Sequence, residues 1–237
     1  MQNAARFKPS EDDVFGRIAR DYDRYCDYFS FYIQRLWKRA FTQAIVSHKG
    51  RHILDLASGT GDIPLRIKRH PNGSDRFIDV TDISSPMLEI AHKKLSHLDG
   101  IKVSIVNACE MDHLPDDHYD LITMAFGMKI IDRTQAIKAI RHKLKPGGVF
   151  LCIEASQIPF APLHKAYLTY MRLCLPIMGR LIANGDSSSY DYLLRGIKAF
   201  PSASDLAREL EAEGFHKVSF KHLSLGIVAI HQAHKPQ

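Results

Sequence analysis

A glycine-rich turn follows the first strongly apolar run of the chain, and its residue types are suited to holding a ligand. Residues 53–57 (Ile-Leu-Asp-Leu-Ala) indicate a buried strand, and residues 58–62 (Ser-Gly-Thr-Gly-Asp) lead from it into a helix. Gly59 and Gly61 let the backbone approach a ligand closely, and the first amides of the helix point toward it. Pro64 stands where the dinucleotide pattern GxGxxG needs its third glycine, so a pyrophosphate ligand is disfavoured.

Residues after the second and third predicted strands suit S-adenosylmethionine, which has an amino acid end, a sulfonium and an adenosine but no phosphate. Asp82 can accept hydrogen bonds from both ribose hydroxyls, and an acid beside Ser84 at a helix N-terminus is the alternative. Met87 either lies against the adenine or packs in the core. Asn107 and Ala108 either meet the adenine edge, through an amide and a backbone donor, or form an ordinary loop.

Asp55 is an acid inside an otherwise apolar strand, and such a position requires a partner. Burying a carboxylate without one costs several kcal/mol. We expect its side chain either to meet the ammonium of the methionine end or to anchor the glycine turn. Cys26, Cys109, Cys152 and Cys174 show neither CxxC pairs nor another metal-like spacing, so we expect free thiols and no metal site. The predicted cofactor is S-adenosylmethionine.

The elements that must position these residues alternate along the chain from Arg51 onward. Short apolar runs and amphipathic helices follow one another, which is typical of a parallel sheet with crossover helices. A helix over 132–144 is stopped by Lys-Pro-Gly-Gly at 145–148. The last two strands have no room for a crossover between them, so they must form an antiparallel hairpin. The predicted strands are residues 53–57, 76–81, 102–106, 119–126, 149–154, 217–223 and 224–231. This arrangement predicts a Rossmann-like class I methyltransferase fold with a seven-stranded, mostly parallel sheet.

Two helical additions accompany the predicted sheet. Residues 1–48 form an N-terminal helical extension, in which aromatic and apolar residues recur at helical spacing. Residues 49–237 form the methyltransferase domain, with a helical insertion at about 158–200. Apolar and basic residues mix in the first part of that insertion, residues 158–184. This part either covers an acceptor pocket or adds one more packed helix pair.

The composition is that of an ordinary globular protein of 237 residues, with 45% hydrophobic and 24% charged residues. No apolar run approaches the roughly 18 residues of a membrane-spanning helix, and the polar N-terminus is unlike a signal peptide. We therefore expect a cytoplasmic protein. Because the net charge of +6 is spread along the chain, no nucleic-acid surface is predicted, and a homodimer stays open.

Five segments together resemble the ubiquinone/menaquinone biosynthesis C-methyltransferase family, from about Val14 to the C-terminus. They are residues 21–23 (Asp-Tyr-Asp), 36–39 (Leu-Trp-Lys-Arg), 54–62, 144–148 and 226–231 (Gly-Ile-Val-Ala-Ile-His). The resemblance implies transfer of the S-adenosylmethionine methyl group to a ring carbon of a prenylated benzoquinol or naphthoquinol. By the family's pattern, Thr60, Asp82, Asn107 and Ala108 contact the cofactor. The insertion would receive the prenyl tail or touch the inner face of the membrane.

Such a reaction needs a general base and good alignment, because the sulfonium is already a strong electrophile. Removing a phenolic proton raises electron density at the adjacent ring carbon. Glu154 and Asp62, both at predicted strand ends, are the candidate catalytic bases. Tyr22 and Tyr190 are candidates to close over the substrate.

The acceptor side departs from the family's pattern. Residues 125–130 read Ala-Phe-Gly-Met-Lys-Ile where the family usually has Ser-Phe-Gly-Leu-Arg-Asn. Lys129 cannot replace the arginine fork, and Ile130 cannot form a hydrogen bond through its side chain. Two alternatives therefore stand beside quinol methylation: a related methyltransferase with another hydrophobic acceptor, and a non-catalytic scaffold that still binds the cofactor.

Overall fold

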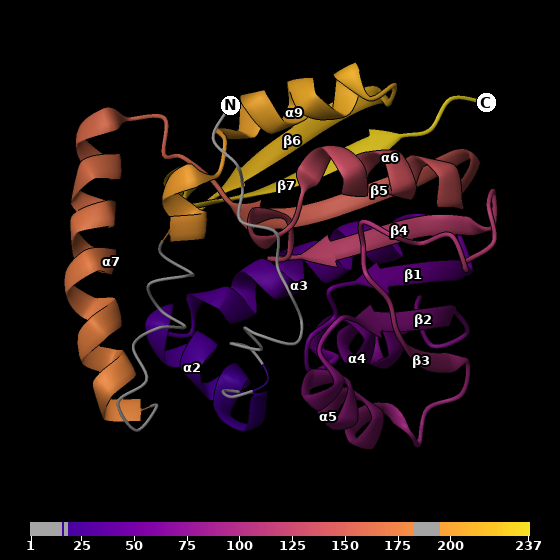
Figure 1. The fold of residues 1–237 in the computed structure, drawn as a ribbon, viewed down its shortest axis with the longest axis horizontal. Coiled ribbons are helices and arrows are strands. Elements are labelled where there is room, and N and C mark those ends of the chain that lie inside the picture. Colours follow the sequence, from indigo (N-terminus) through magenta and orange to yellow (C-terminus); the bar gives the residue numbers. More distant parts are fainter. Residues whose placement is uncertain (1–15, 17–18, 183–194) are drawn as a thin grey trace.

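The computed structural model describes Gly16, residues 19–182 and residues 195–237, and it contains a seven-stranded sheet of order β3-β2-β1-β4-β5-β7-β6 (Figure 1). The strands are β1 (His52–Leu56), β2 (Phe77–Asp82), β3 (Ile101–Ile105), β4 (Tyr119–Ala125), β5 (Leu144–Ala155), β6 (His216–Leu223) and β7 (Val228–His234). β1 to β5 pair in parallel, and β7 is antiparallel to both β5 and β6. The predicted fold class, including the closing antiparallel hairpin, is confirmed.

Helices cover both faces of this sheet because side chains of successive strand residues point to opposite faces. Ile53 packs with α3, α4 and α5 on one face, whereas Leu54 and Leu56 pack with α6 and α9 on the other. The helices are α2 (Tyr22–Phe29), α3 (Ile33–Val46), α4 (Asp62–Arg69), α5 (Ser85–Leu95), α6 (Arg133–Lys143), α7 (Ala161–Ile182) and α9 (Ala203–Ala212), with short 3-10 turns η1 (Ala19–Asp21), η2 (Met128–Ile130) and η3 (Ser224–Gly226). No helix in the described residues has the length and apolar character needed to cross a bilayer.

Two strands begin four or five residues from their predicted starts, whereas the other five begin within one residue of them. β5 starts at Leu144, which pairs with Tyr119, but the register then jumps to Val149 opposite Leu121. Residues 145–148 are therefore looped out within the strand, and Gly147 takes the left-handed conformation with φ of 76°. The final strand was expected from residue 224, which is wrong: residues 224–226 form η3, with φ of 60° at Leu225, and β7 begins only at Val228.

Two neighbouring residues of α3 add polar contacts to the apolar packing of this helix on the sheet. Trp37 donates a hydrogen bond from Nε1 to Ser224 Oγ at 2.8 Å, and its ring centroid lies 6.4 Å from that of Phe126. The next residue, Lys38, places Nζ 2.9 Å from Asp62 Oδ2 at the start of α4. α3 therefore holds both the hairpin turn and the end of the glycine turn.

Candidate active site

The glycine turn after β1 and the carboxylate at the end of β2 are in direct contact. Asp82 accepts hydrogen bonds from the amide of Gly59 at 2.8 Å and from the amide of Ser84 at 2.9 Å. Gly61 has φ of 76°, and a Cβ there would lie 2.9 Å from Leu95 Cδ1, so the turn packs tightly on α5. A Cβ at Gly59 would meet no atom within 4 Å. The turn is thus packed on one side and open at Gly59.

Asp55 anchors this turn, as one of its two predicted roles required. Its side chain is buried and accepts hydrogen bonds from Thr123 Oγ1 at 2.5 Å and from Ser58 Oγ. Burial raises the pKa of Asp55 to about 6, although the Ser58 and Thr123 hydroxyls oppose the shift. The two hydroxyls tie the strand, the turn and neighbouring β4 to one carboxyl group.

Because the pKa of Asp55 is raised, we expect the folded protein to become less stable as the pH rises. The folded protein holds this proton more tightly than the unfolded chain, so the free energy of unfolding decreases as pH rises from 3.8 to about 6. Relative to Asp55→Asn, the wild type should lose about 3 kcal/mol across that window. Urea unfolding of both proteins at about pH 4 and about pH 7 measures the difference. A difference that stays constant with pH would contradict the prediction.

The residues after β3 lie beside the same edge of the sheet. The amide of Val106 donates to the carbonyl of Asp82 at 3.0 Å, and Asn107 Oδ1 accepts from the amide of Cys109 at 3.0 Å. Ala108 and Met87 are both buried. Asn107 thus shapes a tight turn next to Asp82, while contact of these residues with an adenine stays a prediction.

α2 covers the glycine turn through a network that the residue patterns did not predict. Asp23 accepts a hydrogen bond from Thr60 Oγ1 at 2.8 Å, and Lys94 of α5 places Nζ 2.8 Å from Asp23 and 3.1 Å from Thr60 Oγ1. Tyr22 lies beside Cys26 and Asp82: the Cys26 thiol and burial raise the pKa of its phenol well above the ordinary value. The Asp-Tyr-Asp segment of the family resemblance was the signal for Asp23, whereas nothing marked Lys94.

Glu154, a predicted base, and Lys129, predicted on the substrate side, form one buried ion pair. Glu154, at the end of β5, has a completely buried side chain, and its Oε1 lies 3.1 Å from Nζ of Lys129, whose side chain is only 5% exposed. Glu154 also accepts hydrogen bonds from the amides of Lys129 at 3.2 Å and Ala155 at 2.8 Å. Lys129 Nζ donates in addition to the carbonyl of Phe126.

A tyrosine of α7 lies near this ion pair. Burial, the neighbouring Tyr170 and the charge of Glu154 together raise the pKa of Tyr167 to about 12. Tyr167 therefore stays protonated at neutral pH and can donate a hydrogen bond. Tyr190, the other tyrosine predicted on the substrate side, lies outside the described residues.

Asp62, the second candidate base, forms ion pairs with two basic residues of the neighbouring helices α3 and α4. It opens α4, with Lys38 Nζ at 2.9 Å and Arg66 Nε at 3.0 Å from its carboxylate. Burial opposes ionisation, but the charges and hydrogen bonds of Lys38 and Arg66 outweigh it and lower the pKa of Asp62. A carboxylate with a lowered pKa accepts protons poorly. Its catalytic role stays a prediction, and its contacts favour a structural one.

Solved structures share this architecture at low sequence identity. A SAM-dependent methyltransferase from Thermotoga maritima matches 94% of this chain and 98% of its own, with a TM-score of 0.64 and 20% identity. Phosphoethanolamine N-methyltransferase 2 of Haemonchus contortus, solved in complex with S-adenosyl-L-methionine, matches 80% of this chain and 49% of its own, with a TM-score of 0.57 and 15% identity. The fold, with its glycine turn after β1 and acid after β2, is the class I methyltransferase fold.

Sequence comparison narrows the class to one family. The pattern of the ubiE/COQ5 methyltransferase family matches residues 3–235. The chain is 39% identical over 228 residues to a protein of Pseudoalteromonas translucida named ubiquinone/menaquinone biosynthesis C-methyltransferase UbiE, covering 94% of this chain and 89% of the relative. A Rickettsia bellii protein of the same name is 36% identical over 230 residues, covering 94% and 92%. The chain belongs to the ubiE/COQ5 methyltransferase family.

Proposed function

We propose that this protein transfers the methyl group of S-adenosylmethionine to a ring carbon of a prenylated benzoquinol or naphthoquinol in ubiquinone or menaquinone biosynthesis. The observation that carries the proposal is the match to relatives named for this reaction, which extends over 94% of the chain and about nine-tenths of theirs. A buried base at the end of β5 supports it, because quinol methylation needs a group that removes a phenolic proton.

The residues around the glycine turn fit S-adenosylmethionine. The carboxylate of Asp82 lies beside the open position at Gly59 and accepts the amides of Gly59 and Ser84, and in the proposed complex it would also accept ribose hydroxyls. Gly59 offers open space where a side chain would otherwise stand. Asn107, Ala108 and Met87 would surround the adenine. When bound, the cofactor supplies an electrophilic methyl group.

The acceptor ring is prepared by the residues of β5, η2 and α7. Glu154 takes the proton of the acceptor hydroxyl, which raises electron density at the neighbouring ring carbon. After that carbon has gained the methyl group, its hydrogen leaves as a proton and the ring regains its aromaticity. Lys129, 3.1 Å from Glu154, offsets the cost of burying that carboxylate and stabilises negative charge developing on the ring oxygen. Tyr167, whose phenol is protonated at neutral pH and whose pKa is raised in part by the charge of Glu154, donates a hydrogen bond that orients the ring.

Purified protein, labelled S-adenosylmethionine and synthetic short-chain demethyl quinols test this proposal directly. We expect the label on a ring carbon of the benzoquinol or the naphthoquinol, identified by mass spectrometry. A deletion strain should accumulate the demethylated quinone. Absence of both results would contradict the proposal.

Lys129 and Ile130, where the sequence departs from the family's usual Arg-Asn pair, allow a second test of the proposed function. Changing both residues to the family's pair, in Lys129→Arg with Ile130→Asn, should lower quinol methylation by about tenfold, because the larger guanidinium overpacks a site where lysine is 5% exposed. Initial rates with Ile130→Asn alone separate the two contributions. A gain of quinol methylation would instead show that the natural acceptor differs from the family's quinol.

A further inference from the structure

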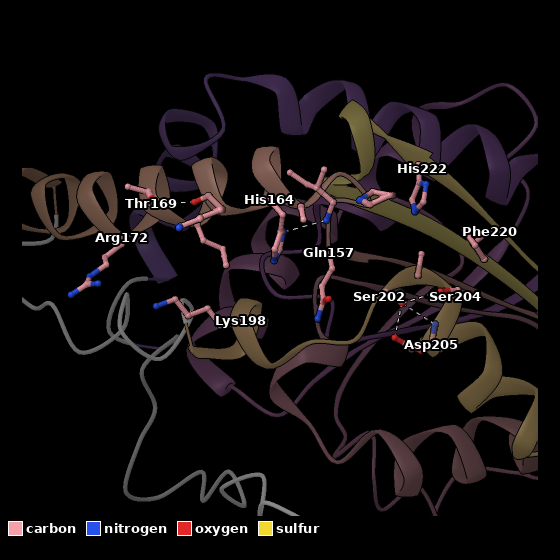
Figure 2. A pocket seen from close by; sticks show the side chains of 16 residues that line it. Gln157, His164, Thr169, Arg172, Lys198, Ser202, Ser204, Asp205, Phe220 and His222 are labelled. Carbon is pink, nitrogen blue, oxygen red and sulfur yellow. Dashed lines mark hydrogen bonds between the residues drawn. The ribbon is translucent and has the colours of Figure 1, made fainter.

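A cavity of about 700 Å³ lies between α7, the start of α9 and β6, outside the candidate active site (Figure 2). Residues of α7 line one side of it, and residues 157–159, just before α7, line it as well. The lining side chains are Gln157, Ile158, Pro159, Ala161, His164, Lys165, Leu168, Thr169, Arg172, Lys198, Ser202, Ala203, Ser204, Asp205, Phe220 and His222. We call this cavity the α7 groove.

The α7 groove carries an excess of positive charge. Lys165, Arg172 and Lys198 line it, and within residues 19–182 and 195–237 none of the three forms an ion pair. Asp205 is its one acidic lining residue in the described chain, and Ser202 at 2.6 Å and Arg208 both bind its carboxylate. The sequence of α7 contains no Asp or Glu. The groove is therefore suited to an anionic ligand.

His164 adds a hydrogen-bond donor to the same wall. Its Nδ1 accepts the amide hydrogen of Ile158 at 3.2 Å, so the neutral ring carries its proton on Nε2. Figure 2 shows His164 in the middle of the groove, with Arg172 and Lys198 toward one end and Phe220 and His222 toward the other. Donors thus extend along the groove.

Exposed apolar side chains lie beside these donors. Phe160, just before α7, is 65% exposed, and Leu225 in η3 is 77% exposed. Gly226, which follows Leu225, lies against Pro159, which precedes Phe160: a Cβ at Gly226 would lie 2.7 Å from Cδ of Pro159. On its inner side α7 packs through Met171 against Ala155 and Ile197. The outward surface of α7 itself carries the exposed apolar residues Leu163 and Leu173 beside Lys165 and Arg172. This mixture of basic and apolar residues is the pattern of a helix that lies on a lipid surface.

We propose that the α7 groove binds the phosphate headgroup of an anionic phospholipid, with Phe160 and Leu225 inserted at the boundary of the acyl chains. The inference deepens the proposed function, because a prenylated acceptor stays in the bilayer and must reach the buried Glu154 from there. The membrane source is favoured over a free phosphate by the exposed apolar pair, which a small soluble anion would leave in water.

Vesicle flotation tests this inference without any methyl acceptor, so its failure would leave the proposed function intact. Wild-type protein should bind phosphatidylcholine vesicles that contain phosphatidylglycerol and not vesicles of phosphatidylcholine alone. Each basic side chain near an anionic surface contributes about fivefold in partitioning. The triple variant Lys165→Gln, Arg172→Gln, Lys198→Gln should therefore bind about 100-fold less, yet methylate a short-chain acceptor in detergent-free buffer as the wild type does.

A triple variant of equal charge change provides the control. Arg69→Gln, Lys93→Gln, Lys102→Gln lies on α4, α5 and β3, toward the opposite end of the sheet order, and all three side chains are exposed. It should bind the anionic vesicles as the wild type does. Equal losses in both triple variants, or equal binding to both kinds of vesicle, would overturn the proposal. Calorimetric binding of inorganic phosphate by the wild type, together with no binding to the anionic vesicles, would identify a free-anion site and overturn it as well.

Discussion

Asp82→Ala should weaken the binding of S-adenosylhomocysteine by about 100-fold or more, measured by calorimetry. The carboxylate is the proposed acceptor for two ribose hydroxyls, and each hydrogen bond to a charged group contributes about 1.5–3 kcal/mol. The same carboxylate accepts the amides of Gly59 and Ser84, so the alanine variant also leaves the turn without its support. Both effects act on the same ligand site, which makes the expected loss large.

Asp79→Asn is the matched control for this variant. Asp79 lies on the same strand, but its carboxylate accepts the hydroxyl of Tyr119 at 2.6 Å and lies away from the glycine turn. The control should lower stability modestly and leave ligand affinity unchanged. If Asp82→Ala binds the ligand as tightly as the control does, Asp82 does not hold the ribose.

Glu154→Gln should lower kcat by about 10²–10⁴-fold, the contribution typical of a general base, while cofactor affinity stays unchanged. Glutamine keeps the shape of the side chain and cannot take a proton. Single-turnover rates with saturating quinol measure the chemical step. A variant that retains most of its kcat would exclude Glu154 as the base.

The buried partner of Glu154 requires a control for folding. Removing one member of a buried ion pair costs about 3–5 kcal/mol, because Lys129 would keep an uncompensated charge. The double variant Lys129→Met, Glu154→Gln removes both charges, so it should recover stability and remain inactive. Recovery of activity in the double variant would show that the loss of activity in Glu154→Gln came from unfolding.

Asp62→Asn should show the opposite pattern: a lower Tm, because Lys38 and Arg66 lose their partner, with kcat nearly unchanged.

Local patterns were sufficient to predict the framework of the site. Strand periodicity located β1 and β2 within one or two residues, and the glycine spacing located the turn between β1 and α4. Asp82 was predictable because parallel strands end at one edge of the sheet, so a polar residue after β2 must lie beside the turn after β1. The short link before β7 required the antiparallel hairpin.

Contacts between distant segments could not be predicted in the same way. Lys129 and Glu154 are separated by β5 and α6, and only the parallel pairing of β4 with β5 brings them within 3.1 Å. Asp23 reaches Thr60 because α2 packs over the turn, and a helix pattern carries no information about where the helix packs. That residues 145–148 loop out within β5 could not be predicted either, because a turn before a strand and a loop inside a strand use the same residue types.

The position of Trp37 gives the chain an intrinsic optical reporter. It is the single tryptophan of the sequence, and it bridges α3, the end of β4 and the turn before β7. Its fluorescence can be excited apart from the tyrosines, and the emission follows the polarity around the indole. Detachment of α3 from the sheet would therefore be visible as a spectral shift without any label, while far-ultraviolet circular dichroism follows the total secondary structure.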